Sequence, residues 1–136
     1  MTAPMTNRQV ETAAIAFVLA QELSDGRPGK DTRGQGLAGD VQCGERIIEV
    51  KAFGGSARGS DLWLEVRQVE EARVNADFWL YIVENVRQGD PQHFRLLRIG
   101  GAELQDLLLR AREKHYYEVA FPVSVYDRLV DGEAAT

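Results

Sequence analysis

Residues 39–51 read GDVQCGERIIEVK and predict a β-hairpin. Glycine at the first central position favours a two-residue type II′ turn, which here would be Gly44-Glu45. The register that follows from this turn pairs Cys43 with Arg46, Val41 with Ile48, and Asp40 with Glu49. A shift of one residue would move Asp40 to the other face of the sheet, so the position of this carboxylate depends on the turn.

Side chains alternate between two faces along the second strand of this hairpin. Ile48 and Val50 point to one face, where we expect apolar packing, and Ile47, Glu49 and Lys51 point to the other. The strand therefore carries a carboxylate and a lysine, two residues apart, on one face of an otherwise apolar segment.

The predicted pairing brings two carboxylates together. The Cβ atoms of directly opposed residues lie roughly 4.5–5.5 Å apart, so Asp40 and Glu49 would repel each other unless a positive charge lay between them. A divalent cation would satisfy the pair, and ligation by oxygen alone favours a hard ion such as Mg²⁺ or Mn²⁺. Lys51 would then orient a metal-bound water or stabilise charge on a phosphate. These groups suit metal-assisted hydrolysis of a phosphodiester; the alternative is a surface hairpin with ordinary acidic and basic residues.

The rest of the chain alternates helices and strands. Thr6 and Gln9 form a capping box at the start of a helix that Ser24-Asp25-Gly26 ends. Periodicity predicts strands at 40–42, 46–53, 78–84, 94–99 and 117–121, and helices near 66–75 and 104–111. Such interleaving predicts an α/β sandwich around one mixed sheet. We expect a single domain over residues 1–136, with a frayed acidic tail at 131–136.

Composition sets further limits. The chain has 136 residues, 44% hydrophobic and 27% charged, which is typical of a globular protein rather than a disordered, collagen-like or membrane-embedded one. The lone Cys43 excludes an intramolecular disulfide, and without a convincing secretion signal we expect a cytoplasmic protein. One cysteine and two histidines give no zinc-ligand spacing. The net charge of −5 argues against a protein that binds nucleic acid over its whole surface.

Several segments, taken in order, resemble a known family. They are Gly39-Asp40-Val41, Ile48-Glu49-Val50-Lys51, the glycine-bearing loop that follows, Gln68-Val69-Glu70-Glu71-Ala72, and Phe78-Trp79-Leu80-Tyr81-Ile82-Val83. Asp40 together with Glu49-Val50-Lys51 resembles the signature of PD-(D/E)xK nucleases. More narrowly, residues 9–100 resemble the family of uncharacterised domains related to the C-terminal region of the plant protein NO VEIN.

The resemblance implies a restriction-endonuclease-like fold, an α/β/α sandwich around a central mixed sheet, and a metal-dependent nuclease. Asp40 and Glu49 would be ligands of Mg²⁺ or Mn²⁺, joined by the main-chain carbonyl of Val50. Lys51 would orient the attacking water or contact the phosphate.

Two further site residues follow only from the resemblance. Glu11 matches an acidic position that many such nucleases direct into the site, although an exposed acid in the first turn of a helix also suits the helix dipole. Gln68 matches a position where relatives carry glutamine or glutamate, and the alternative is a plain glutamine on a helix surface.

These observations lead to two hypotheses about function. The first is a Mg²⁺-dependent endonuclease that acts on DNA in a defence or restriction system. Its acidic charge predicts weak binding to nucleic acid or recruitment by a partner protein, and a homodimer would let it cut both strands of a duplex. The alternative is an inactive nuclease-fold module for protein interaction or nucleic-acid sensing. Neither hypothesis involves a membrane.

Overall fold

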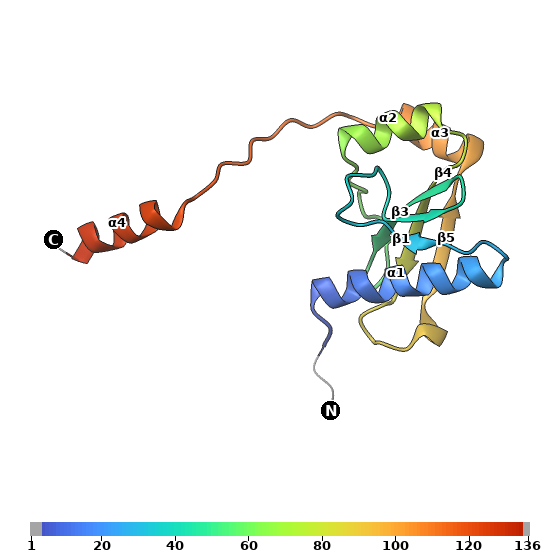
Figure 1. Ribbon diagram of the computed structural model, residues 1–136, viewed down its shortest axis with the longest axis horizontal. Coiled ribbons are helices and arrows are strands. Elements are labelled where there is room, and N and C mark those ends of the chain that lie inside the picture. Colours follow the sequence, from blue (N-terminus) through green and yellow to red (C-terminus); the bar gives the residue numbers. More distant parts are fainter. Residues whose placement is uncertain (1–3, 135–136) are drawn as a thin grey trace.

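The computed structural model describes residues 4–134, which form a five-stranded sheet with helices on both faces (Figure 1). In chain order the elements are α1 (Asn7–Ser24), β1 (Lys30–Asp31), β2 (Val41–Cys43), β3 (Arg46–Ala52), α2 (Val66–Val74), β4 (Phe78–Glu84), the 3-10 turn η1 (Pro91–His93), β5 (Arg95–Ile99), α3 (Gly101–Leu109) and α4 (Val123–Ala134). Within residues 4–134, no helix combines the length and the apolar character that a membrane crossing requires.

The strands lie side by side in the order β1-β2-β3-β4-β5, and only the β3–β4 pair is parallel. The hairpin has the predicted register, with Cys43 opposite Arg46 and Val41 opposite Ile48. Gly44 has a φ of 60°, the left-handed conformation that a turn with glycine at its first central position needs. The prediction of the hairpin and of its mixed sheet is therefore confirmed.

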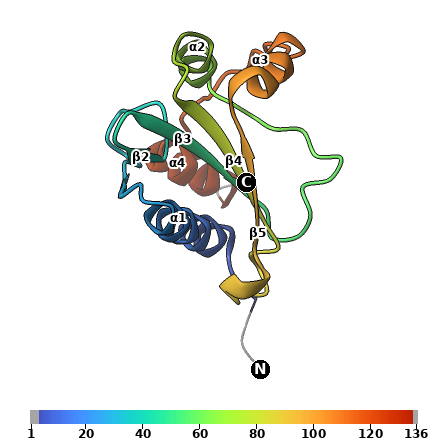
Figure 2. The ribbon, with the colours of Figure 1, turned by 90° about the vertical axis from the view of Figure 1, so that its right-hand side faces the viewer.

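Helix α1 covers one face of the sheet, and α2 and α3 cover the other (Figure 2). The core under α1 combines apolar residues of the helix with those of β2, β3 and β4: Val10, Ala14, Ile15, Val18, Val41, Ile48, Val50, Tyr81 and Val83. The core on the other face is smaller and contains Ala72, Phe78, Leu80, Leu104 and Leu108. Strand β4 is buried on both faces, as its continuous apolar sequence predicts. This arrangement confirms the α/β sandwich.

The start of α1 shows how local sequence fixes an element. The main-chain N–H of Gln9 donates to Oγ1 of Thr6 at 3.2 Å, and the N–H of Thr6 donates to Oε1 of Gln9 at 2.8 Å. The two bonds satisfy donors that the first turn of a helix otherwise leaves free. The predicted capping box is confirmed, and it sets the residue at which α1 begins.

The C-terminal part of the chain corrects the prediction. The alternation of Tyr117, Val119 and Phe121 predicted a strand, but residues 111–122 belong to no strand or helix. They lead away from the sheet to α4, which the sequence did not predict (Figure 1). Alternation describes only side chains, whereas a strand also needs a partner for its main-chain hydrogen bonds. Residues 131–134, predicted as frayed, continue α4, and 135–136 lie outside the described residues.

Candidate functional site

Asp40 is fixed by three hydrogen bonds. Its main-chain N–H donates to the carbonyl of Ile48 at 2.9 Å, and its carbonyl accepts from the N–H of Thr32 at 2.8 Å. Its side-chain Oδ2 accepts from the N–H of Val50 at 3.0 Å. The paired residues of β2 and β3 end at Val41 and Ile48, and Asp40, the next residue, bonds to the main chain of Ile48 and Val50. The predicted main-chain pairing of Asp40 with Glu49 is therefore not observed, although the two carboxyl groups are neighbours.

Gly39 lies so close to β3 that it has no room for a side chain. An added Cβ would lie 2.6 Å from Cγ2 of Ile47 and 2.9 Å from the main-chain oxygen of Ile48. The hydroxyl of Thr32 donates to the carbonyl of Gly39 at 2.9 Å and holds the chain in this position. Strand β1, which ends one residue before Thr32, was not predicted because its side chains are polar. It nevertheless helps to place Asp40.

Replacing Gly39 by alanine is expected to lower the free energy of unfolding by about 1–3 kcal/mol, because the main-chain oxygen that the new Cβ meets belongs to β3 and cannot retreat freely. Urea denaturation followed by circular dichroism would measure this loss. Gly55→Ala is the matched control, since a Cβ there meets open space. Similar losses in both variants would contradict the close-approach explanation.

Glu49 is a buried carboxylate with one oxygen left unpaired. The residue is only 4% exposed, and Nζ of Lys51 lies 3.1 Å from its Oε2. Burial and the neighbouring Asp40 raise the pKa of Glu49 to about 7, against the opposing charge of Lys51. Its Oε1 has no hydrogen-bond partner within the described part of the chain. A buried polar atom without a partner destabilises the fold, so this oxygen favours an added proton or cation.

These residues line a cavity of about 470 Å³ between α1 and the end of β3. Its lining consists of Asn7, Val10, Glu11, Asp40, Glu49, Val50, Lys51, Ala52, Phe53, Gly54 and Arg87. The structure therefore brings Asp40, Glu49, Val50, Lys51 and Glu11 to one place, although Glu11 is far from the others in sequence.

The two residues selected only by resemblance have partners of their own. Glu11 lines the cavity, but its side chain is half-exposed and forms an ion pair with Arg33 at 3.3 Å. Gln68 is buried, and its Oε1 accepts from the main-chain N–H of Glu65 at 2.9 Å, which caps α2. Gln68 is not among the residues that line this cavity. A role for either residue in a reaction stays a prediction.

Arg87 is a cavity residue that the sequence analysis missed. Its guanidinium donates to Oδ1 of Asn7 at 2.8 Å and to the carbonyl of Met5 at 3.0 Å. Gly54 leaves space for it, because a Cβ there would lie 2.6 Å from Nε of Arg87. The available signal was topological: β3 and β4 are parallel, so the segments after them meet at the same edge of the sheet. With Lys51, Arg87 gives the cavity a second cation.

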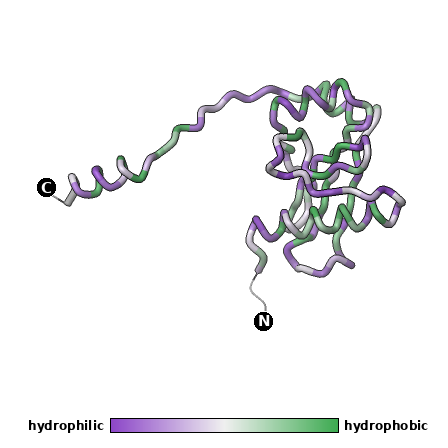
Figure 3. The backbone as a smooth tube through the Cα atoms, in the orientation of Figure 1, coloured by the Kyte–Doolittle hydropathy of each residue, from purple (hydrophilic) through white to green (hydrophobic). Residues whose placement is uncertain are grey.

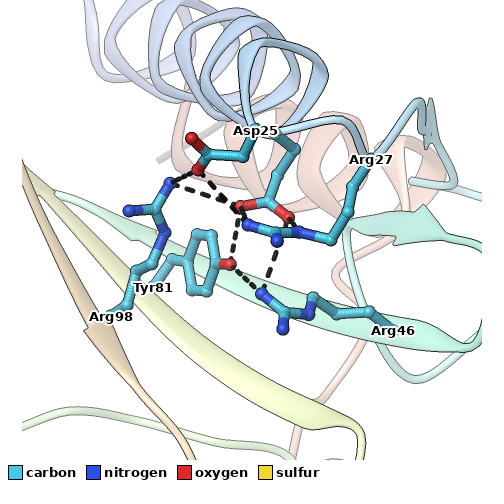
Figure 4. Close-up of polar contacts among 6 residues, drawn as sticks. Asp25, Arg27, Arg46, Tyr81 and Arg98 are labelled. Carbon is cyan, nitrogen blue, oxygen red and sulfur yellow. Dashed lines mark hydrogen bonds and ion pairs between the residues drawn. The ribbon is translucent and has the colours of Figure 1, made fainter.

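A second polar cluster, also missed, lies at the other end of α1 (Figure 4). Glu22 is fully buried there. The hydroxyl of Tyr81 donates to its Oε1 at 2.7 Å, and the guanidinium of Arg27 donates to both of its oxygens. Arg46 donates to the hydroxyl of Tyr81 at 2.9 Å, and Arg98 reaches Oε1 of Glu22 at 3.4 Å. The cluster joins α1, β3, β4, β5 and the loop after α1.

Charge compensation keeps this buried carboxylate ionised. Burial alone would raise the pKa of Glu22, but hydrogen bonds from Arg27 and Tyr81, with the charges of Arg27 and Arg46, outweigh burial and lower it. Arg46 also lies over the ring of Trp79, 4.4 Å from its centroid. No sequence motif could reveal the cluster, because its members come from five separate segments.

The capacity of the cavity to hold a metal depends on two carboxylates. Asp40 and Glu49 supply the acidic oxygens, and Val50 lines the same cavity. No group of three or more His, Cys, Asp and Glu side chains among residues 4–134 is placed to hold an ion. Two carboxylates still suit Mg²⁺, which commonly takes one or two and keeps several waters. The free Oε1 of Glu49 is consistent with such a donor set.

Comparisons with known proteins agree with the sequence resemblance. A family model described as "Protein NO VEIN, C-terminal" matches residues 10–97. No curated protein and no solved structure matches significantly. The wider relation to PD-(D/E)xK nucleases stays a prediction. The matched region spans α1 to β5 and includes the hairpin and the cavity, so this chain belongs to the family of the NO VEIN C-terminal domain.

Proposed function

We propose that this protein hydrolyses phosphodiester bonds of nucleic acid, with DNA as the expected substrate, in the cavity formed by Asp40, Glu49 and Lys51. The observation that supports this most is the pair of neighbouring carboxylates beside a lysine, with Oε1 of buried Glu49 left unpaired. A purely structural hairpin would gain nothing from placing two acids together in a cavity. We include the reducing cytoplasm in the proposal, because Cys43 is free and buried.

In this proposal Asp40, Glu49 and the carbonyl of Val50 hold one divalent cation. Mg²⁺ or Mn²⁺ would supply positive charge that polarises the phosphate and lowers the pKa of a bound water. Lys51 orients that water or donates to a phosphate oxygen, where negative charge grows in the transition state. Arg87, which lines the cavity, attracts the polyanionic backbone.

A non-catalytic module remains the second candidate, because the charged groups of the cavity have partners already. Lys51 is paired with Glu49, and Glu11 with Arg33. The net charge of −5 also opposes unaided binding to nucleic acid. In such a module the cavity residues would only stabilise the hairpin, and a partner protein or nucleic acid would bind to another surface.

Thermal unfolding with and without Mn²⁺ tests the metal site. A cation that binds only the folded state raises stability by about 2.7 kcal/mol when its concentration is a hundred times its Kd. We expect millimolar Mn²⁺ to raise the Tm of the wild type but not that of Asp40→Ala. Glu45→Ala, which removes an exposed acid from the turn of the same hairpin, should keep the shift. A wild type with no shift would count against the metal site.

Cleavage assays then separate catalysis from binding. We expect Lys51→Ala to keep the Mn²⁺ shift but to lose cleavage of supercoiled DNA by at least about a hundredfold, since it removes transition-state stabilisation. Linear and single-stranded DNA and RNA, tested in parallel, define the substrate. Equal cleavage by Lys51→Ala and wild type would assign the activity to a contaminant. A metal shift without cleavage on any of these substrates would favour the non-catalytic module.

A further inference from the structure

The C-terminal arm, residues 111–134, exposes several large apolar side chains. It extends away from the sheet and its helices (Figure 1), and Figure 3 shows a hydrophilic stretch near the domain followed by hydrophobic residues before and within α4. Several large apolar side chains of the arm are more than half exposed: Tyr116, Tyr117, Val119, Phe121, Val123, Tyr126 and Leu129. Exposed aromatic and aliphatic groups gathered in one segment mark an interaction surface.

The helix of this arm, α4, has two distinct faces. At 100° per residue, its apolar residues fall on one side, which Glu133 of the last turn shares: Val123, Val125, Tyr126, Leu129 and Val130. Ser124, Asp127, Arg128 and Asp131 fall on the other side. A helix of 12 residues is marginal in water by itself and gains most of its stability by packing an apolar face. The helix therefore needs a surface to pack against.

A groove of suitable character begins where the arm leaves the domain. It lies between residues 60–64 and α3 and encloses about 370 Å³. Its apolar lining is formed by Leu62, Leu64, Leu80, Leu104, Leu107 and Leu108. Trp63, which also lines it, is 62% exposed. Basic residues at one end, Arg110, Arg112 and Lys114, lie near the start of the arm.

We propose that α4 of each chain seats its apolar face in this groove of a second copy, so that two chains exchange arms about a twofold axis. The summed charges are complementary: α4 carries Asp127, Asp131 and Glu133 against Arg128, and the groove carries Arg110, Arg112 and Lys114 against Asp61. The first residues of the arm line the groove themselves, so a twofold axis that passes beside the groove would place the start of each arm next to the groove of the other copy. This exchange does not depend on the proposed hydrolysis.

Two other occupants fit the observations less well. An arm that folded back into its own groove would have to reverse direction at residues 111–114, whereas the chain leads outward there (Figure 1). A membrane surface favours helices with lysine and arginine on the polar face, and α4 has one arginine against two aspartates there. A second copy satisfies both the apolar face and the charges.

Sedimentation velocity of the full chain, from low to high micromolar concentration, tests the exchange. We expect a monomer–dimer equilibrium. Leu129→Asp on α4 and Leu107→Asp in the groove should each weaken dimerisation at least tenfold, since each buries a charge in the apolar contact. Ser124→Asp, on the polar face of the same helix, is the matched control and should dimerise as the wild type does. Both apolar residues are exposed in this structure, so the variants should keep their folded spectra.

A mixture of the two variants gives the decisive result. Each variant alone lacks one half of every arm–groove contact, but the mixed pair keeps one intact contact, so we expect a heterodimer to form in the mixture. A dimer that Leu129→Asp weakens and Leu107→Asp does not would indicate pairing between helices and overturn the proposal. A wild type that stays monomeric at every concentration would also overturn it. Binding of that monomer to anionic phospholipid vesicles would assign the arm to a membrane surface instead.

Discussion

Glu22→Ala is expected to lower the free energy of unfolding by about 3–5 kcal/mol, the loss typical of removing one partner from a buried ion pair. The substitution leaves Arg27, Arg46 and Arg98 facing one another without their shared carboxylate. It also removes the acceptor of the buried hydroxyl of Tyr81. Like charges and an unsatisfied hydroxyl then add to the empty space left by the side chain.

Urea denaturation followed by tryptophan fluorescence would measure this loss, since Arg46 lies over the ring of Trp79. Glu11→Ala is the matched control: it removes an acid of the same helix whose single ion pair, with Arg33, is half-exposed. We expect it to change stability by less than about 1 kcal/mol. If Glu22→Ala lowered the free energy of unfolding no more than the control does, the ion pairs and hydrogen bonds of Glu22 would not stabilise the fold as proposed.

The same network predicts resistance to acid. Because the pKa of Glu22 is lowered in the folded state, its contribution is complete above the pKa of an unfolded glutamate. The contribution disappears only as the pH falls through the lower, folded value. The ion-pair network should therefore persist under mildly acidic conditions.

Glu49→Gln is expected to stabilise the metal-free protein at pH 8 and to have little effect at pH 5. The pKa of Glu49 is raised from 4.5 to about 7, so the folded state disfavours its charge. Between these values the unfolded chain ionises before the folded one, and stability falls as the pH rises. Above pH 7 the penalty is complete and on the order of 3 kcal/mol. Glutamine removes the charge and with it most of the pH dependence.

Thermal unfolding between pH 5 and 8 in the presence of EDTA would test this prediction. Lys51→Met provides a contrasting variant, because it removes the cation 3.1 Å from Oε2 and leaves the carboxylate charge uncompensated. Its stability should fall more steeply with pH than that of the wild type. A wild type whose stability does not change over this range, with Glu49→Gln less stable at every pH, would contradict the raised pKa.

The hairpin shows which features of the fold the local sequence can predict. The turn at Gly44 fixes the register of the three pairs from Cys43–Arg46 to Val41–Ile48, and Asp40 follows directly after the last pair. The capping box at Thr6 likewise sets the start of α1. These features involve residues within about ten positions of one another, where turn chemistry and side-chain periodicity decide the conformation.

The C-terminal arm shows the limit of such reasoning. Alternating apolar residues at 117–121 have the pattern of a strand but find no main-chain partner in the described chain. The apolar face of α4 exists only in its helical conformation, which the sequence pattern did not indicate. The local sequence pattern indicates which side chains are apolar enough to be buried. It does not indicate which segment they pack against.

The sequence by itself determined the sandwich, the ends of α1 and β4 and the register of the hairpin, because periodicity and turn geometry act over short separations. Only the tertiary structure decided that Glu11 and Arg87 line the same cavity and that Glu22 is buried among arginines. It also decided that one oxygen of Glu49 is left unpaired. Burial, and the pKa values that follow from it, depend on which distant segments pack together, and short-range sequence patterns do not carry that information.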